Sequence, residues 1–110
     1  MNLTERINVA LALPGVPVSV MENPTDSGKI NKFIVIIPEN DDITYADDKP
    51  LDFVEGAALQ LYCKGNYLGF RDEVTNALIA ADITISSRRY MEYEQDTGYH
   101  HYIIEVAGVN

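Results

Sequence analysis

Tryptophan is absent from this 110-residue sequence, there is a single cysteine, and there are only two histidines. With Cys63 alone the chain can form no internal disulfide, which excludes the small secreted folds that disulfides hold together. Basic residues are also scarce: 8 Lys and Arg stand against 17 Asp and Glu, a formal net charge of −9. Such a charge opposes binding to nucleic acid phosphates and to anionic lipids.

Long apolar runs are missing too. The longest, Phe33 to Ile37, is far too short to span a bilayer, so we expect no membrane association. The first residues show no basic segment followed by an apolar one, as a signal peptide would have, and we expect folding in the cytoplasm. With 46% hydrophobic and 23% charged residues, the composition is that of one ordinary globular domain, residues 1–110.

Hydrophobic periodicity predicts the secondary structure. Apolar residues at helical spacing predict helices over residues 3–13 and 67–81. Segments rich in β-branched and aromatic residues predict strands at 16–20, 32–38, 53–63, 83–93 and 99–106, with another short strand possible at 43–46. This order predicts an α+β fold, a mainly antiparallel sheet of four to five strands with two helices packed on one face.

Two segments of this pattern are unusual. Phe33 to Ile37 is apolar at every position, so the strand needs either core on both of its faces or a partner subunit. The segment from Glu39 to Glu55 holds seven carboxylates and a single cation, Lys49, which is six of the nine net negative charges. We expect residues 39–52 to form an acidic connection between strands.

Residue types that are often catalytic or metal-binding in other proteins are poorly placed for these roles here. His100 and His101 are adjacent on a strand and point to opposite faces, so they cannot easily share one metal ion. Cys63 ends an apolar strand, where a free cysteine usually acts as a small buried hydrophobic residue. Glu92 and Glu94 share a strand face, but we interpret them as a solvated or subunit-facing edge.

The remaining motifs also lack the required spacing. The aspartates of the acidic segment do not have the pattern of a calcium-binding loop, and the glycines form no phosphate-binding loop. We therefore expect no enzymatic activity, no catalytic residues, no cofactor and no specific metal site.

Two features of the C-terminal third are typical of protein interfaces. Arg88 and Arg89 point to opposite faces of a strand, and they are candidates for salt bridges to a neighbouring acidic subunit, with plain solvation as the alternative. The terminal hairpin holds four of the seven tyrosines, whose rings stabilise sheets and also suit interfaces. These tyrosines are Tyr90, Tyr93, Tyr99 and Tyr102.

The order of segments resembles a known family. The sequence runs from an "LPGVPV" turn through "KFIVIIPE", "TYADDKPL", "GAALQLYCKG" and "FRDEVTNALIAAD" to "RRYMEYEQDTGYHHYIIEV". Over nearly the whole chain this resembles the tail terminator proteins, also called tail completion or tail-to-head joining proteins, of long-tailed bacteriophages and prophages.

The resemblance implies a homo-oligomeric ring, typically hexameric, in the virion tail, assembled in the host cytoplasm. Such a ring caps the tail tube, stops its polymerisation and docks onto the head connector, while DNA passes through its centre without specific binding. We expect Asp41, Asp42, Asp47 and Asp48 at the channel or tail-tube interface. We expect Arg88, Arg89, Tyr90, Tyr93 and Tyr99 at the interface between subunits.

Other functions remain open from the sequence. The nearest alternative is another head-tail joining component, such as a head-closure or minor capsid protein. A small α+β binding module is a different class, and a hydrolase that uses Glu92 and Glu94 is the most remote.

Overall fold

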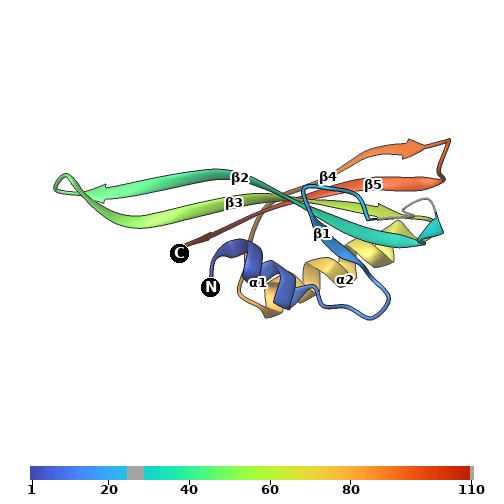
Figure 1. The fold of residues 1–110 in the computed structure, drawn as a ribbon, viewed down its shortest axis with the longest axis horizontal. Coiled ribbons are helices and arrows are strands. Elements are labelled where there is room, and N and C mark those ends of the chain that lie inside the picture. Colours follow the sequence, from blue (N-terminus) through green and yellow to red (C-terminus); the bar gives the residue numbers. More distant parts are fainter. Residues whose placement is uncertain (25–28, 110) are drawn as a thin grey trace.

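The computed structural model describes residues 1–24 and 29–109, which form a five-stranded sheet and two helices (Figure 1). The elements are α1 (Leu3–Ala10), β1 (Val18–Val20), β2 (Lys32–Ala46), β3 (Lys49–Cys63), α2 (Tyr67–Ala80), β4 (Thr84–Glu94) and β5 (Tyr99–Val109). The strand order in the sheet is β1-β2-β3-β5-β4. β1 is parallel to β2, and the other three strand pairs are antiparallel. Both helices lie on one face, so the predicted α+β class is confirmed.

The first helix begins at a capping box that the sequence contains. The Asn2 side chain accepts a hydrogen bond from the Glu5 backbone N–H (2.8 Å), and the Glu5 carboxylate accepts one from the Asn2 N–H (3.2 Å). Both bonds satisfy backbone donors that have no partner inside a helix. The helix ends at Ala10 rather than at Leu13, because Pro14 disfavours helical backbone in the residue before it.

The second helix covers the centre of the sheet. The Asn66 side chain caps its start by accepting a hydrogen bond from the Gly69 N–H (3.1 Å). Its buried residues recur every fourth position, as one face of a helix requires: Phe70, Val74 and Leu78. They join residues of α1 and of the sheet in the main hydrophobic cluster.

The strand segment that is apolar at every position is covered on both faces within the subunit. Ile34 and Ile36 are completely buried in the main cluster beneath the helices. Phe33 and Val35 point to the opposite face and pack with Tyr99 in a second, smaller cluster. The sequence allowed an internal core or a partner subunit at this strand, and the internal core is the correct explanation.

The expectation of an acidic connection at residues 39–52 is wrong, whereas the possible short strand at 43–46 is confirmed as the end of β2. β2 and β3 continue through this segment as paired strands and meet at a two-residue turn, Asp47 and Asp48. Both turn residues have positive φ values (52° and 64°), as a type I′ hairpin turn requires, and aspartate tolerates this backbone better than most residues. The carboxylates give this segment the composition of a loop, but all except the two in the turn lie on strands that project into solvent.

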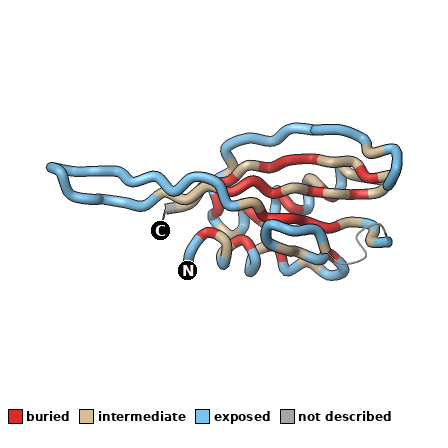
Figure 2. The backbone as a smooth tube through the Cα atoms, turned by 45° about the horizontal axis from the view of Figure 1, so that its top comes forward, coloured by how far each residue is buried: buried red, intermediate tan, exposed pale blue. Residues whose placement is uncertain are grey.

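This hairpin extension gives the molecule its shape. We call residues 39–55 the arm; it extends away from the rest of the domain, and it is exposed along most of its length (Figure 2). The molecule measures 53 × 24 × 24 Å as a consequence. Within the described ranges, neither helix is long and apolar enough to cross a membrane.

Candidate functional site: the arm and the β4 edge

The arm begins at a β-bulge that changes which side chains face the helix layer. Pro38 pairs with Ala57 and Asp41 with Glu55, so two residues of β2 oppose the single residue Gly56 of β3. Such an extra residue shifts the alternation of side chains by one position. Even-numbered residues of β2 face the helices before the bulge, and odd-numbered residues share that face beyond it.

An apolar surface follows from this shift. Ile43 and Phe53 are directly paired across the strands, and alternation places Tyr45 on the same face as Ile43. With Leu51, at an irregularity near the turn, these side chains are between 43% and 63% exposed. A well-packed domain rarely leaves four large apolar side chains together in solvent, and such patches mark interaction sites. We call the face of Ile43, Tyr45 and Phe53 the apolar face of the arm.

The carboxylates expected at a channel or tube interface occupy three parts of the arm. Asp41 lies on the apolar face, close to the main body. Asp42 lies on the opposite face, where the neighbouring pair of Thr44 and Asp52 is joined by a hydrogen bond from the Asp52 N–H to the Thr44 hydroxyl (3.1 Å). The remaining two, in the turn, form the tip. The arm is therefore polar on one face and at its end, and apolar on the other face.

The base of the arm is attached to the N-terminus of α1. The Glu55 carboxylate accepts a hydrogen bond from the Leu3 backbone N–H (3.2 Å), a donor at the helix start. A hollow of about 380 Å³ lies beside this contact, lined by Asn2, Asp41, Ile43, Phe53 and Glu55. Its two apolar residues, Ile43 and Phe53, are about half exposed.

The two arginines lie on the edge strand β4, on opposite sides of the sheet as the sequence predicts. Arg88 points toward α2, where its guanidinium donates to the Thr75 hydroxyl (3.3 Å) and lies 4.0 Å from the Asp72 carboxylate. Arg89 points to the other side and forms an ion pair with Glu105, which lowers the pKa of that carboxyl. Both arginine side chains remain more than a third exposed, at 38% and 53%.

Large side chains continue this edge toward the turn. Tyr90, Met91 and Tyr93 are all at least 42% exposed. Within the subunit, Tyr93 packs against His100, and the Tyr90 hydroxyl lies 3.0 Å from Nδ1 of the same histidine. We call residues 88–93 of β4 the aromatic edge, since it combines two cations with three exposed large side chains.

Tyr99 does not belong to this surface, which corrects its assignment to a subunit interface. Only 2% of the residue is exposed, its ring packs edge-on against Phe33, and its hydroxyl donates to the Ile30 carbonyl. It is the first residue of β5 and faces the side away from the helices, where the second cluster lies. Sequence alternation alone could not reveal that this cluster exists.

Cys63 is buried, as expected at the end of an apolar strand. Burial raises the pKa of its thiol, which disfavours the thiolate that a nucleophile needs, although Lys32 acts in the opposite direction. A hollow of about 490 Å³ beside it is lined by residues around the start of β2, of the β3–α2 connection and of α2: Asn31, Lys32, Cys63, Lys64, Asn66, Gly69, Phe70 and Glu73.

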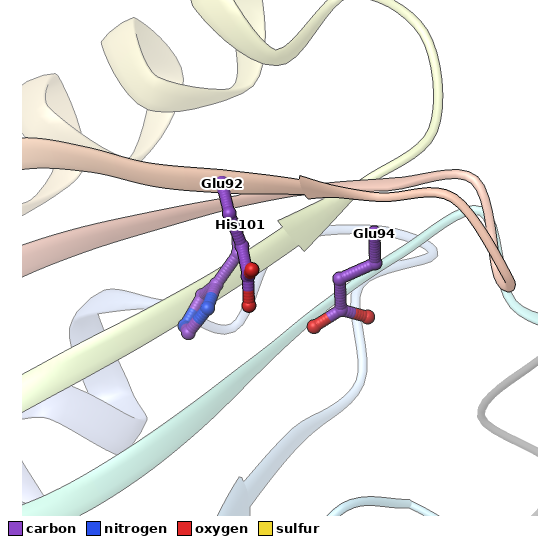
Figure 3. A group of neighbouring side chains, drawn as sticks. All are labelled: Glu92, Glu94 and His101. Atoms are coloured by element: carbon purple, nitrogen blue, oxygen red, sulfur yellow. The ribbon is translucent and has the colours of Figure 1, made fainter.

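The two histidines occupy opposite faces, as predicted, but one of them joins a group that the sequence analysis missed. His101, Glu92 and Glu94 place their ligand atoms within 4.8 Å of one another (Figure 3). Burial lowers the pKa of His101, and the two nearby carboxylates act in the opposite direction. The sequence did contain a signal for this group. When strand partners are counted backward from the terminal turn, Glu92 stands opposite His101.

Comparison with known proteins identifies no relative. No protein-family model matches the sequence, and no curated protein is significantly similar to it. The geometry of the arm, the aromatic edge and the histidine group must therefore carry the functional argument.

Proposed function

We propose that this chain is a structural subunit of a head-to-tail ring that terminates a phage tail tube, as its resemblance to tail terminators implies. The single observation that carries the proposal is the arm, whose apolar face stays exposed in the isolated subunit. Its side chains contribute little to the fold of their own chain. Because these residues are about half exposed, their complete burial against a neighbouring molecule would contribute about half of the roughly 1.5–3 kcal/mol that a fully exposed large side chain gains.

A second copy of this chain offers a complementary surface. The arm carries seven carboxylates and one lysine, whereas the aromatic edge carries two arginines and one carboxylate, Glu92, beside exposed aromatic rings. Opposite charge steers the two surfaces together, and aromatic side chains with arginine are enriched at the centres of interfaces. The proposed contact places the apolar face of one arm on the aromatic edge of the next subunit.

Two different surfaces on each subunit generate a head-to-tail contact, which closes into a ring when the rotation between subunits permits. In this arrangement the face of Asp42 and Asp52 stays in water. A channel lined by carboxylates repels DNA phosphates and lets the genome slide without binding. The ring's further partners would be the tail tube protein and the head connector, and the chain itself would need no catalysis or cofactor.

The proposal is tested in the phage or prophage that encodes the chain. Electron microscopy of tails made without the protein should show tubes longer than normal, and wild-type protein supplied in trans should restore their length. The double variant Ile43→Thr/Phe53→Thr should fail to restore it, because it removes the apolar face while keeping residues that suit strands.

The matched control changes the other face of the same strand pair without removing charge, with Val54→Thr, and should restore normal tails. Tails of normal length that stay unattached to heads would instead identify a head-closure component. Complete, infectious particles without the protein would contradict a role in assembly altogether.

A further inference from the structure

A group of three potential metal ligands lies at the end of the β4–β5 hairpin. Glu92 pairs with His101 and Glu94 with Tyr99, and alternation along β4 puts both glutamates on the side of the sheet away from the helices. His101 points to the same side, so two carboxylates and one imidazole from two paired strands converge (Figure 3). Glu94 and His101 lie outside both surfaces of the proposed ring contact, whereas Glu92 also belongs to the aromatic edge.

The imidazole is held in place by two neighbours. The His101 ring stacks on Tyr62 with centroids 4.4 Å apart and 10° between the planes. Its Nε2 contacts the side-chain oxygen of Gln60, an acceptor. In the tautomer with its proton on Nε2, this contact is a hydrogen bond and the lone pair on Nδ1 remains for coordination. Metal-binding histidines characteristically have their second nitrogen fixed in this way.

The carboxylates lack the usual compensation for their charge. Within residues 1–24 and 29–109, neither Glu92 nor Glu94 forms an ion pair with a lysine or arginine. Glu94 accepts a hydrogen bond from the Thr97 hydroxyl (3.0 Å), which orients one of its oxygens. A bound cation would relieve the repulsion between two close carboxylates.

We propose that Glu92, Glu94 and His101 bind one divalent transition-metal ion, with Zn²⁺ as the ion to test. The mixed donor set suits such ions better than Mg²⁺ or Ca²⁺, which prefer oxygen ligands alone. Bonds of about 2.0–2.2 Å place ligand atoms roughly 3.4 Å apart around zinc, so the glutamate side chains need only small rotations. The ion clamps the two strands of the terminal hairpin and keeps a coordination position open to water.

Titration calorimetry of the full chain, without an affinity tag, with ZnCl₂ tests the site directly. The expected result is one ion per chain, with affinity at least tenfold weaker in Glu92→Gln, in Glu94→Gln and in His101→Gln. The matched control is His100→Gln, because this neighbouring histidine lies on the other face and should leave the affinity unchanged. Glu92 is exposed, so Glu92→Gln separates loss of the ion from loss of the fold.

Two further measurements distinguish zinc bound at this site from zinc bound elsewhere on the chain. The variant Asp47→Asn/Asp48→Asn removes charge from the arm tip and should keep the full affinity. Co²⁺ in place of Zn²⁺ should give visible absorption bands that disappear in His101→Gln. The proposal is overturned if the wild-type chain binds no zinc, if His100→Gln weakens binding as much as His101→Gln, or if Glu92→Gln and Glu94→Gln bind normally.

Discussion

The two halves of the β2–β3 hairpin belong to one continuous pair of strands but differ in how far their apolar side chains are buried. Between Lys32 and Ile37 the strand is covered on both faces, and its apolar side chains stabilise the domain. Beyond the bulge at Glu39 and Asn40 the same strand pair continues with its apolar side chains in solvent. Strand pairing thus continues without burial, and the proposed contact would bury the apolar side chains of the arm against another subunit.

Removing the arm should produce the largest effect on assembly. A chain in which residues 42–54 are replaced by Asn-Gly keeps the Asp41 and Glu55 pair and closes it with a favoured two-residue turn. We expect it to fold with stability within about 1 kcal/mol of the wild type, because the removed residues are mainly exposed. Sedimentation velocity should show that ring formation is abolished.

Loss of the fold, seen as loss of the cooperative urea transition, would show instead that the arm is part of the structural core. Rings that form without residues 42–54 would show that the arm does not take part in the subunit contact.

Substituting the same residue type in the two halves of β2 sharpens the comparison. Ile36→Ala should destabilise the domain by about 2–5 kcal/mol, since it opens a cavity under the helices. Ile43→Ala should change the free energy of unfolding by no more than about 0.5 kcal/mol, because the side chain is exposed. Urea denaturation of both variants at low protein concentration measures the difference. Equal losses would mean that the apolar face of the arm is packed within its own subunit.

Neutralising four arm carboxylates should have an intermediate effect. In the variant with Asp41, Asp42, Asp47 and Asp48 changed to Asn, the subunit should fold normally, because these side chains are exposed. The channel would lose negative charge, so DNA ejection should slow or tail joining should fail. Phage titre and ejection kinetics measure the effect, with Glu22→Gln, an exposed carboxylate outside the arm, as control. Unchanged titre and kinetics would place these carboxylates away from the DNA path.

The smallest effect is expected at the turn. Asp47 and Asp48 both adopt positive φ, a backbone for which Asn-Gly is better suited. The variant Asp47→Asn/Asp48→Gly should stabilise the arm locally by roughly 1 kcal/mol, because Asn and Gly adopt positive φ at a lower cost. Hydrogen exchange of the amides in residues 43–52 should slow, while exchange in the main sheet stays the same. Faster exchange in the arm would contradict the type I′ assignment.

Hydrophobic periodicity predicted most of the fold because apolar residues recur at the positions that become buried. The capping box at Asn2, the four-residue spacing in α2 and the terminal hairpin are local signals, and the structure contains all three. The continuous pairing of the arm was missed, although a short strand at 43–46 was considered, because its strands bury neither face and the aspartates gave the composition of a loop. The alternation of Ile43 and Tyr45, mirrored by Leu51 and Phe53 across the turn, was the available signal.

The candidate sites depended on contacts that no local pattern contains. The bulge at Glu39 and Asn40 decides which arm residues share a face, and bulges leave no reliable mark in a sequence. The burial of Tyr99 depends on Phe33, which is distant along the chain. Long-range packing of this kind decides which aromatic residues of the terminal hairpin reach solvent.

Photo-crosslinking tests the central claim that the apolar face of the arm docks on another copy of the chain. A photoreactive phenylalanine analogue at position 43 reports on the apolar face, and the same group at position 44 reports on the opposite face. Our account predicts crosslinks between chains from position 43 to residues 88–93, with few from position 44. Crosslinks absent from both positions in assembled tails, or equal from both, would contradict it.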